Sequence, residues 1–139
     1  MTQASKLFSV LTLSVLLVPA IGCGPSGPVT TPVSGSVSYD GTPLDNGYVT
    51  FRDTDSSTPS AAGKIGADGT YTVDVIPGSK TVEITSSRDV PGKFDMSNPG
   101  VKVQLTEQFI PEDYNKQTKL TAEVGDDAMT LDFDLEAVN

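Results

Sequence analysis

Residues 33–51, VSGSVSYDGTPLDNGYVTF, decide the fold class of this chain. The first half alternates apolar or small residues with serines: Val33, Gly35 and Val37 against Ser34, Ser36 and Ser38. A period of two is typical of a β-strand with one buried face. Asp40-Gly41 and Asp45-Asn46-Gly47 are turn signals, because Asp, Asn and Gly tolerate left-handed backbone angles. Val49 and Phe51 then resume the apolar face, so the stretch predicts a β-hairpin with a turn-rich connection.

The same alternation continues toward the C-terminus. It predicts further extended segments at residues 60–66, 70–76, 80–86, 120–124 and 129–135. The last two are expected to form a hairpin around Gly125-Asp126-Asp127, with three acidic residues facing water: Asp132, Asp134 and Glu136. Strong helical periodicity is absent, so the fold is predicted to be all-β.

Residues 87–119 form the least regular part of the chain, and they are long for a loop in a compact domain. One strand is predicted within them from three alternating apolar residues: Val101, Val103 and Leu105. A short helical turn is expected at residues 110–115. Three aromatic residues either form a platform for a ligand or hold the loop against the core: Phe94, Phe109 and Tyr114. This segment is therefore the first candidate for a binding surface.

Residues 1–22 are expected to be a lipoprotein signal peptide. Lys6 precedes an apolar run at residues 7–18, which is too short for a membrane-spanning helix of about 20 residues. The segment Ala20-Ile21-Gly22-Cys23 resembles the bacterial lipobox, in which the cysteine sulfur is acylated, with palmitate for example, and the chain is cut before it. Ordinary cleavage after Ala20 is the alternative, and it would leave Cys23 as a free exported thiol. Residues 23–32 are then a lipidated cysteine and a flexible tether rich in Pro and Gly.

The composition argues against several classes of function. A net charge of −9 disfavours contact with phosphate backbones, so nucleic acid is not an expected partner. The chain contains no His, which removes Ser-His and Cys-His nucleophilic sites and typical zinc sites. Asp53 and Asp55 have a spacing suited to calcium, but Thr58 stands where a calcium loop needs Gly. We therefore expect no catalytic residue, no metal and no cofactor.

A family resemblance runs through residues 33–136. Four motifs carry it: V-x-G-x-V-x-x-D-G-x-P-L-x-x-G-x-V-x-F at 33–51, G-x-D-G-x-Y at 66–71, P-G-x-x-x-V-x-I at 77–84 and I-P-x-x-Y-N-x-x-T-x-L at 110–120. They resemble the carboxypeptidase-regulatory-like, transthyretin-like β-sandwich domains, and more narrowly the small lipoproteins of this type in planctomycete bacteria. The resemblance implies a single antiparallel Greek-key β-sandwich of seven strands over residues 33–139. It does not carry over the activity of transthyretin-related hydrolases, because those enzymes use His.

The sequence thus predicts a non-enzymatic lipoprotein, exported and anchored by its lipid to the periplasmic or outer-surface face of a bacterial membrane. Its sandwich is expected to contact another envelope protein or a polysaccharide. The alternative is a module that binds a small ligand, carbohydrate or calcium, through residues 87–119 or the Asp-rich turns.

Overall fold

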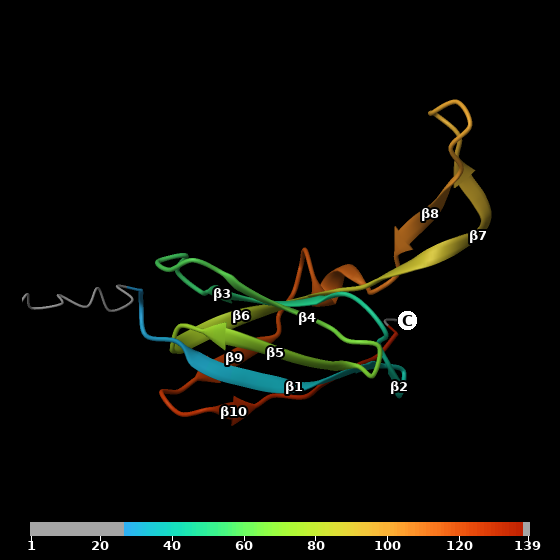
Figure 1. Cartoon of the computed structure of the whole chain (residues 1–139). Helices are drawn as coiled ribbons and strands as arrows, with labels where there is room; N and C mark the ends of the chain where they lie inside the picture. Colours follow the sequence, from blue (N-terminus) through green and yellow to red (C-terminus); the bar gives the residue numbers. More distant parts are fainter. Residues whose placement is uncertain (1–26, 138–139) are drawn as a thin grey trace, which may run out of the picture.

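The structure is a computed structural model that describes residues 27–137, and this part of the chain is all-β (Figure 1). Its strands are β1 (Thr31–Tyr39), β2 (Thr42–Pro43), β3 (Tyr48–Asp53), β4 (Ala61–Lys64), β5 (Thr70–Val75), β6 (Gly78–Thr85), β7 (Ser87–Asp95), β8 (Val103–Gln108), β9 (Thr121–Val124), β10 (Met129–Thr130) and β11 (Phe133–Leu135). A single 3₁₀ turn, η1 (Glu112–Tyr114), lies where the short helical turn is predicted. The described residues contain no helix long and apolar enough to cross a bilayer. The predicted signal peptide and Cys23 lie outside the described residues.

Two sheets pack face to face around one core. In the first sheet, β5 pairs antiparallel with one side of β1, while β10 and β11 pair parallel with its other side. The second sheet has the strand order β4-β3-β6-β9, and all its pairs are antiparallel. The alternation predicted the buried residues of both sheets, namely Val33, Val37, Tyr71 and Val75 in the first and Val49, Phe51, Val82 and Ile84 in the second. Phe51 and Tyr71 meet between the sheets, with ring centroids 6.3 Å apart.

The predicted hairpin at residues 33–51 is wrong, because β1 and β3 belong to different sheets. Only the short strand β2 folds back along the end of β1. The chain then carries Leu44 into the core, where the residue is 4% exposed, and the Leu44 amide donates to the Val37 carbonyl at 3.0 Å. To bury Leu44, the chain crosses the end of the core and continues into the second sheet. A tight turn would instead keep both strands in one sheet.

The predicted C-terminal hairpin is also wrong. Strand β9 pairs with β6, whereas β10 and β11 run parallel to β1, so the first sheet is not wholly antiparallel. The hydroxyl of Thr31, which is fully buried, donates to the Gly125 carbonyl at 2.6 Å and fixes the turn after β9 beside the start of β1. For the same reason β1 begins at Thr31, inside the stretch predicted to be tether.

The parallel ladder is interrupted between β10 and β11, opposite Gly35. There the Leu131 amide donates to the Ser34 carbonyl at 2.8 Å, and the Tyr71 hydroxyl donates to the Leu131 carbonyl at 2.8 Å. A Cβ atom on Gly35 would lie 1.8 Å from that carbonyl oxygen. Glycine at this position therefore lets the C-terminal strands approach β1.

The third sheet consists of β7 and β8 alone, and it projects from the sandwich (Figure 1). It leaves the body at the end opposite to the start of β1. One strand was predicted in this region, and the structure contains two. Strand β7 does not alternate regularly because its register against β8 shifts between Asp89 and Phe94, around Pro91-Gly92.

Candidate functional site

The β7–β8 hairpin and its connecting loop hold most of the exposed apolar side chains of the described residues. Seven large hydrophobic residues are exposed in the described part of the chain, and five of them lie in this hairpin and its loop: Phe94, Met96, Val101, Val103 and Leu105. Single exposed hydrophobic residues are normal on a protein surface, whereas a cluster of them marks an interaction surface. We call these five residues the hairpin patch.

The two faces of the hairpin differ in chemistry. Directly opposed residues share a face in an antiparallel pair, so the register places Val103 and Leu105 on the face that also carries the Arg88–Glu107 ion pair. In that pair the Arg88 Nε and the Glu107 Oε1 are 2.9 Å apart. The other face carries Phe94, with the Lys102 ammonium 3.7 Å from the ring centroid. Both faces thus combine apolar side chains with a cation.

The base of the hairpin is clamped to the sandwich through Asn46. The Asn46 Oδ1 accepts hydrogen bonds from the Ser86 hydroxyl and the Ser87 amide, each at 3.2 Å. The Ser86 amide also donates to the Gln108 side chain at 3.1 Å, and Ser86 is buried. Asn46 belongs to a predicted turn, but the sequence did not reveal that it also fixes the direction of the hairpin.

The structure separates the three predicted aromatic residues. Phe109 packs against the core and meets Tyr39 edge-on at 5.7 Å between centroids, with the Arg88 guanidinium 5.3 Å above its ring. Tyr114 also packs against the core, and its hydroxyl accepts from the Glu136 amide at 3.1 Å. Phe94 instead lies on the projecting hairpin. Phe109 and Tyr114 therefore hold residues 109–114 against the body, while Phe94 belongs to the exposed surface.

A cavity of about 440 Å³ lies between the hairpin base and the turn after β1. Its lining combines aromatic and aliphatic side chains with one cation, and consists of Tyr39, Asp40, Thr42, Pro43, Leu44, Asp45, Arg88 and Phe109. A lining that combines apolar side chains with a few polar groups is typical of a small-ligand pocket. Residues 87–119 thus contribute Arg88 and Phe109 to the cavity.

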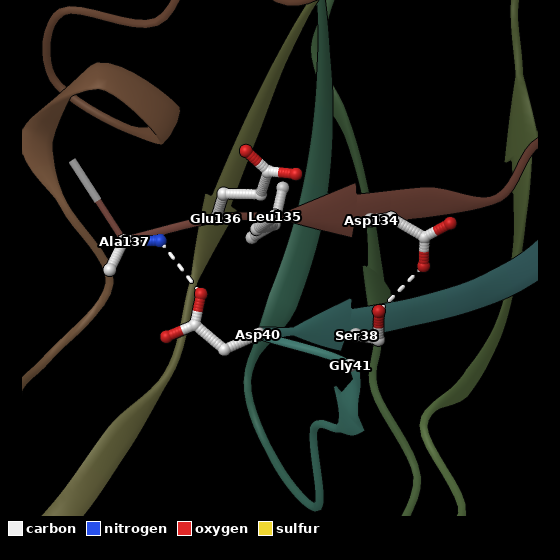
Figure 2. Close-up of a pocket in the computed structure, with 7 residues that line it drawn as sticks. All are labelled: Ser38, Asp40, Gly41, Asp134, Leu135, Glu136 and Ala137. Atoms are coloured by element: carbon white, nitrogen blue, oxygen red, sulfur yellow. Dashed lines mark hydrogen bonds between the residues drawn. The ribbon is translucent and has the colours of Figure 1, made fainter.

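A second cavity, of about 520 Å³, is acidic and shares Asp40 with the first (Figure 2). The Asp40 Oδ1 accepts from the Ala137 amide at 2.8 Å, and the Asp134 Oδ1 accepts from the Ser38 hydroxyl at 2.6 Å. Figure 2 shows that the carboxylates of Asp40, Asp134 and Glu136 point in three different directions. Within residues 27–137, no group of three or more His, Cys, Asp or Glu is arranged to hold a metal ion.

The acidic face predicted at the C-terminus is exposed, and it also links two strands. The Asp132 Oδ1 accepts from the Ser36 amide at 2.7 Å and from the Ser36 hydroxyl at 2.9 Å. Asp134 accepts from the Ser38 hydroxyl alone. The serines of β1 thus face two carboxylates, one just before β11 and one within it. These acidic side chains therefore support the parallel strand pair.

Asp53, the first carboxylate of the possible calcium loop, is occupied by an ion pair with Lys80. Lys80 is 2% exposed, and the Asp53 Oδ2 also accepts from the hydroxyls of Ser57 at 2.8 Å and Thr58 at 2.6 Å. Hydrogen bonds from Lys80, then from Thr58 and Ser57, lower the pKa of the Asp53 carboxyl far below its ordinary value of 3.8. The sequence contained a signal for this buried cation, because Lys80 lies in phase with Val82 and Ile84.

This ion pair predicts an acid-sensitive contribution to stability. The pKa of Asp53 is lower in the folded state than in the unfolded state, so the stabilisation is present above about pH 4 and is lost as pH falls from 3.8 through the folded pKa. We expect Asp53→Asn to melt well below the wild type at about pH 6, because buried Lys80 loses its partner. The difference in melting temperature between Asp53→Asn and the wild type should narrow markedly by about pH 2, as measured by thermal melts followed by circular dichroism.

Asp126→Asn, at an exposed turn, is the control and should change neither melting curve. A gap between Asp53→Asn and the wild type that stays constant from pH 6 to pH 2 would contradict the role assigned to the ion pair.

Comparisons with known proteins assign no family. No family model matches the chain, and no curated protein matches it. A DUF3823 family protein from Parabacteroides merdae ATCC 43184 is similar in structure at 15% sequence identity and a TM-score of 0.41, over 78% of this chain and 46% of that protein. A 9R-lipoxygenase from Cyanothece PCC8801 is similar at 17% identity and a TM-score of 0.35, over 77% of this chain and 17% of the lipoxygenase. The chain thus spans less than half the length of either, and likenesses this weak assign it no activity.

Proposed function

We propose that this protein is a non-enzymatic, lipid-anchored protein of the bacterial cell envelope that presents the β7–β8 hairpin to another envelope component. The hairpin patch carries this proposal, since it gathers five of the seven exposed large hydrophobic residues of the described chain on one projection. Exposed apolar surface of this kind is costly in water and is stabilised when a partner covers it.

The transthyretin-like sandwich remains part of the proposal. Seven strands remain when β10 and β11 are taken as one interrupted strand and β2 and the projecting hairpin are set aside. The chain passes between the two sheets at four points, after β1, β4, β5 and β9, which favours Greek-key connections. The four motifs in residues 33–136 support the same family.

Acylation of Cys23 would hold the protein at a membrane through the lipobox described above. Stable anchoring needs two or more acyl chains, at about 0.8 kcal/mol per buried methylene. The start of β1 and the hairpin lie at opposite ends of the sandwich (Figure 1), so an anchor before β1 would allow the hairpin to point away from the bilayer. That arrangement favours a protein or polysaccharide partner for the hairpin patch.

A small-ligand module is the second candidate, and the cavity beside Phe109 favours it. Carbohydrate suits the mixed aromatic and polar lining of this cavity. Calcium at the Asp-rich turn of residues 53–58 is disfavoured, because Asp53 is already paired with Lys80. A thermal-shift titration with a glycan panel separates the two candidate functions, since only the small-ligand module requires a saturable rise in melting temperature.

Chemical cross-linking of intact envelopes, followed by capture of the full chain, tests the leading proposal. Val103→Glu combined with Leu105→Glu is expected to lower the yield of cross-linked products about tenfold or more, because losing a buried apolar anchor costs about 2 kcal/mol of binding. The matched control is Tyr48→Glu, which changes an exposed aromatic residue on β3, outside the hairpin. Undiminished products from the double variant, or an equal loss from Tyr48→Glu, would contradict the proposal.

A further inference from the structure

The β7–β8 hairpin is an incomplete sheet. Neither strand pairs with a strand of the sandwich, and most of its side chains are exposed. A two-stranded hairpin is at best marginally stable in water, and a third strand or a covering element normally supports it. The exposed hairpin patch and the missing strand pairing both indicate that a covering element is absent from the hairpin.

The two outer edges of this hairpin are not equivalent. The edge of β7 is interrupted by Pro91, by Gly92 at a φ of +73°, and by the register shift between Asp89 and Phe94. At this irregularity the Gln104 side chain donates to the carbonyls of Val90 at 2.7 Å and Lys93 at 3.0 Å. Proline, bulges and lysine are the usual devices that prevent pairing at a sheet edge.

The edge of β8 carries none of these devices. Its six residues, VQLTEQ, contain no Pro, Gly or Lys. The outer strands of the second sheet, β4 and β9, are shorter, with four residues each. Strand β8 therefore offers the open edge of the projecting hairpin, and its Val103 and Leu105 side chains are 51% and 41% exposed.

We infer that this edge pairs with the β8 strand of a second copy of the chain, so that two hairpins form one four-stranded sheet. The inference rests on the proposed role of the hairpin as the contact element. Antiparallel pairing about a two-fold axis brings Val103 and Leu105 of both copies together on one face, and a two-fold interface of this kind closes after two copies.

Charge favours the same partner. Arg88 pairs with Glu107 on one face of the hairpin, and Lys102 lies over the Phe94 ring on the other face, so these charges already have partners within one copy. Residues 87–108 contain three basic and three acidic residues, whereas the whole chain has a net charge of −9. Two hairpins can therefore meet without the repulsion that opposes contact between the two acidic bodies.

Disulfide trapping in intact cells tests this pairing with the full chain. Single substitutions Gln104→Cys, Leu105→Cys and Thr106→Cys place thiols along the centre of β8, and opposed Cβ atoms at a two-fold axis lie close enough for a disulfide. We expect at least one of them to give a covalent dimer after mild oxidation. The matched positions Asp89→Cys and Lys93→Cys on β7 should give none, and the parent chain reports any background from Cys23.

A second variant keeps the result specific. Adding Val103→Glu to the variant that forms the dimer should lower the dimer yield at least tenfold, with the monomer melting curve as a check of folding. Dimer formation from β7 equal to that from β8 would overturn the inference. No dimer from any β8 position would also overturn it, and continued cross-linking of the hairpin to a different envelope protein would then leave the proposed function standing.

Discussion

Gly35→Ala is expected to destabilise the fold by about 3 kcal/mol or more, although Ala in place of Gly usually stabilises a strand by about 0.4–1 kcal/mol. The added Cβ would lie 1.8 Å from the Leu131 carbonyl oxygen and 2.6 Å from the carbonyl carbon, and both are backbone atoms. The strands after Ala128 must then move away from β1, and the hydrogen bond from the Tyr71 hydroxyl to that carbonyl is lost with them. Urea unfolding followed by circular dichroism measures the change.

Gly125→Ala is the control, since its Cβ meets no atom within 4 Å, and it should change stability by no more than about 0.5 kcal/mol. Equal stability of the Gly35→Ala and Gly125→Ala chains would show that β10 and β11 do not approach β1 as closely as described.

Cys23→Ser is expected to transfer nearly all of the chain from the membrane pellet to the soluble exported fraction. Serine has no thiol to acylate, and two acyl chains of about fifteen methylenes each contribute on the order of 20 kcal/mol to membrane binding. Fractionation of cells followed by immunoblotting measures the distribution.

The double variant Cys23→Ser with Ser26→Cys is a matched control, because it restores a thiol three residues beyond the lipobox and should stay soluble. A parent chain that is already soluble would favour ordinary cleavage after Ala20. A Cys23→Ser chain that still sediments with membranes would contradict the anchor.

Local alternation predicted the strands, and the pairing of those strands could not be read from it. Val33, Phe51 and Ile84 each belong to a series in which every second residue of a strand is apolar. Each strand buries one face, and this alternation is visible within a few residues. Whether β9 turns back onto β10 depends on the hydrogen bond from Thr31 to Gly125, which lie 94 residues apart. No local pattern announces such a contact, and the predicted C-terminal hairpin failed for this reason. The predicted hairpin at residues 33–51 failed because Leu44 is buried in the core between the two sheets.

The candidate surface was predicted only as a region. The length and irregularity of residues 87–119 indicated it, yet Pro91-Gly92 concealed the strand β7. Alternation at Val103 and Leu105 predicts a strand but does not tell whether the apolar face packs within the same chain. The structure shows that the Val103 and Leu105 side chains do not pack within the chain, so β8 is an exposed strand and not part of the core.

The continuity of β6 and β7 through buried Ser86 has a mechanical consequence. Strand β6 is paired with β3 on one side and β9 on the other, so it is an inner strand of its sheet. A partner that pulls on the hairpin would load β6 first, and the force would be shared in shear by two hydrogen-bonded ladders. If the opposite end of the domain is tethered to a membrane, tension between tether and hairpin would run through the interior of the sandwich, where the fold can best resist being torn open.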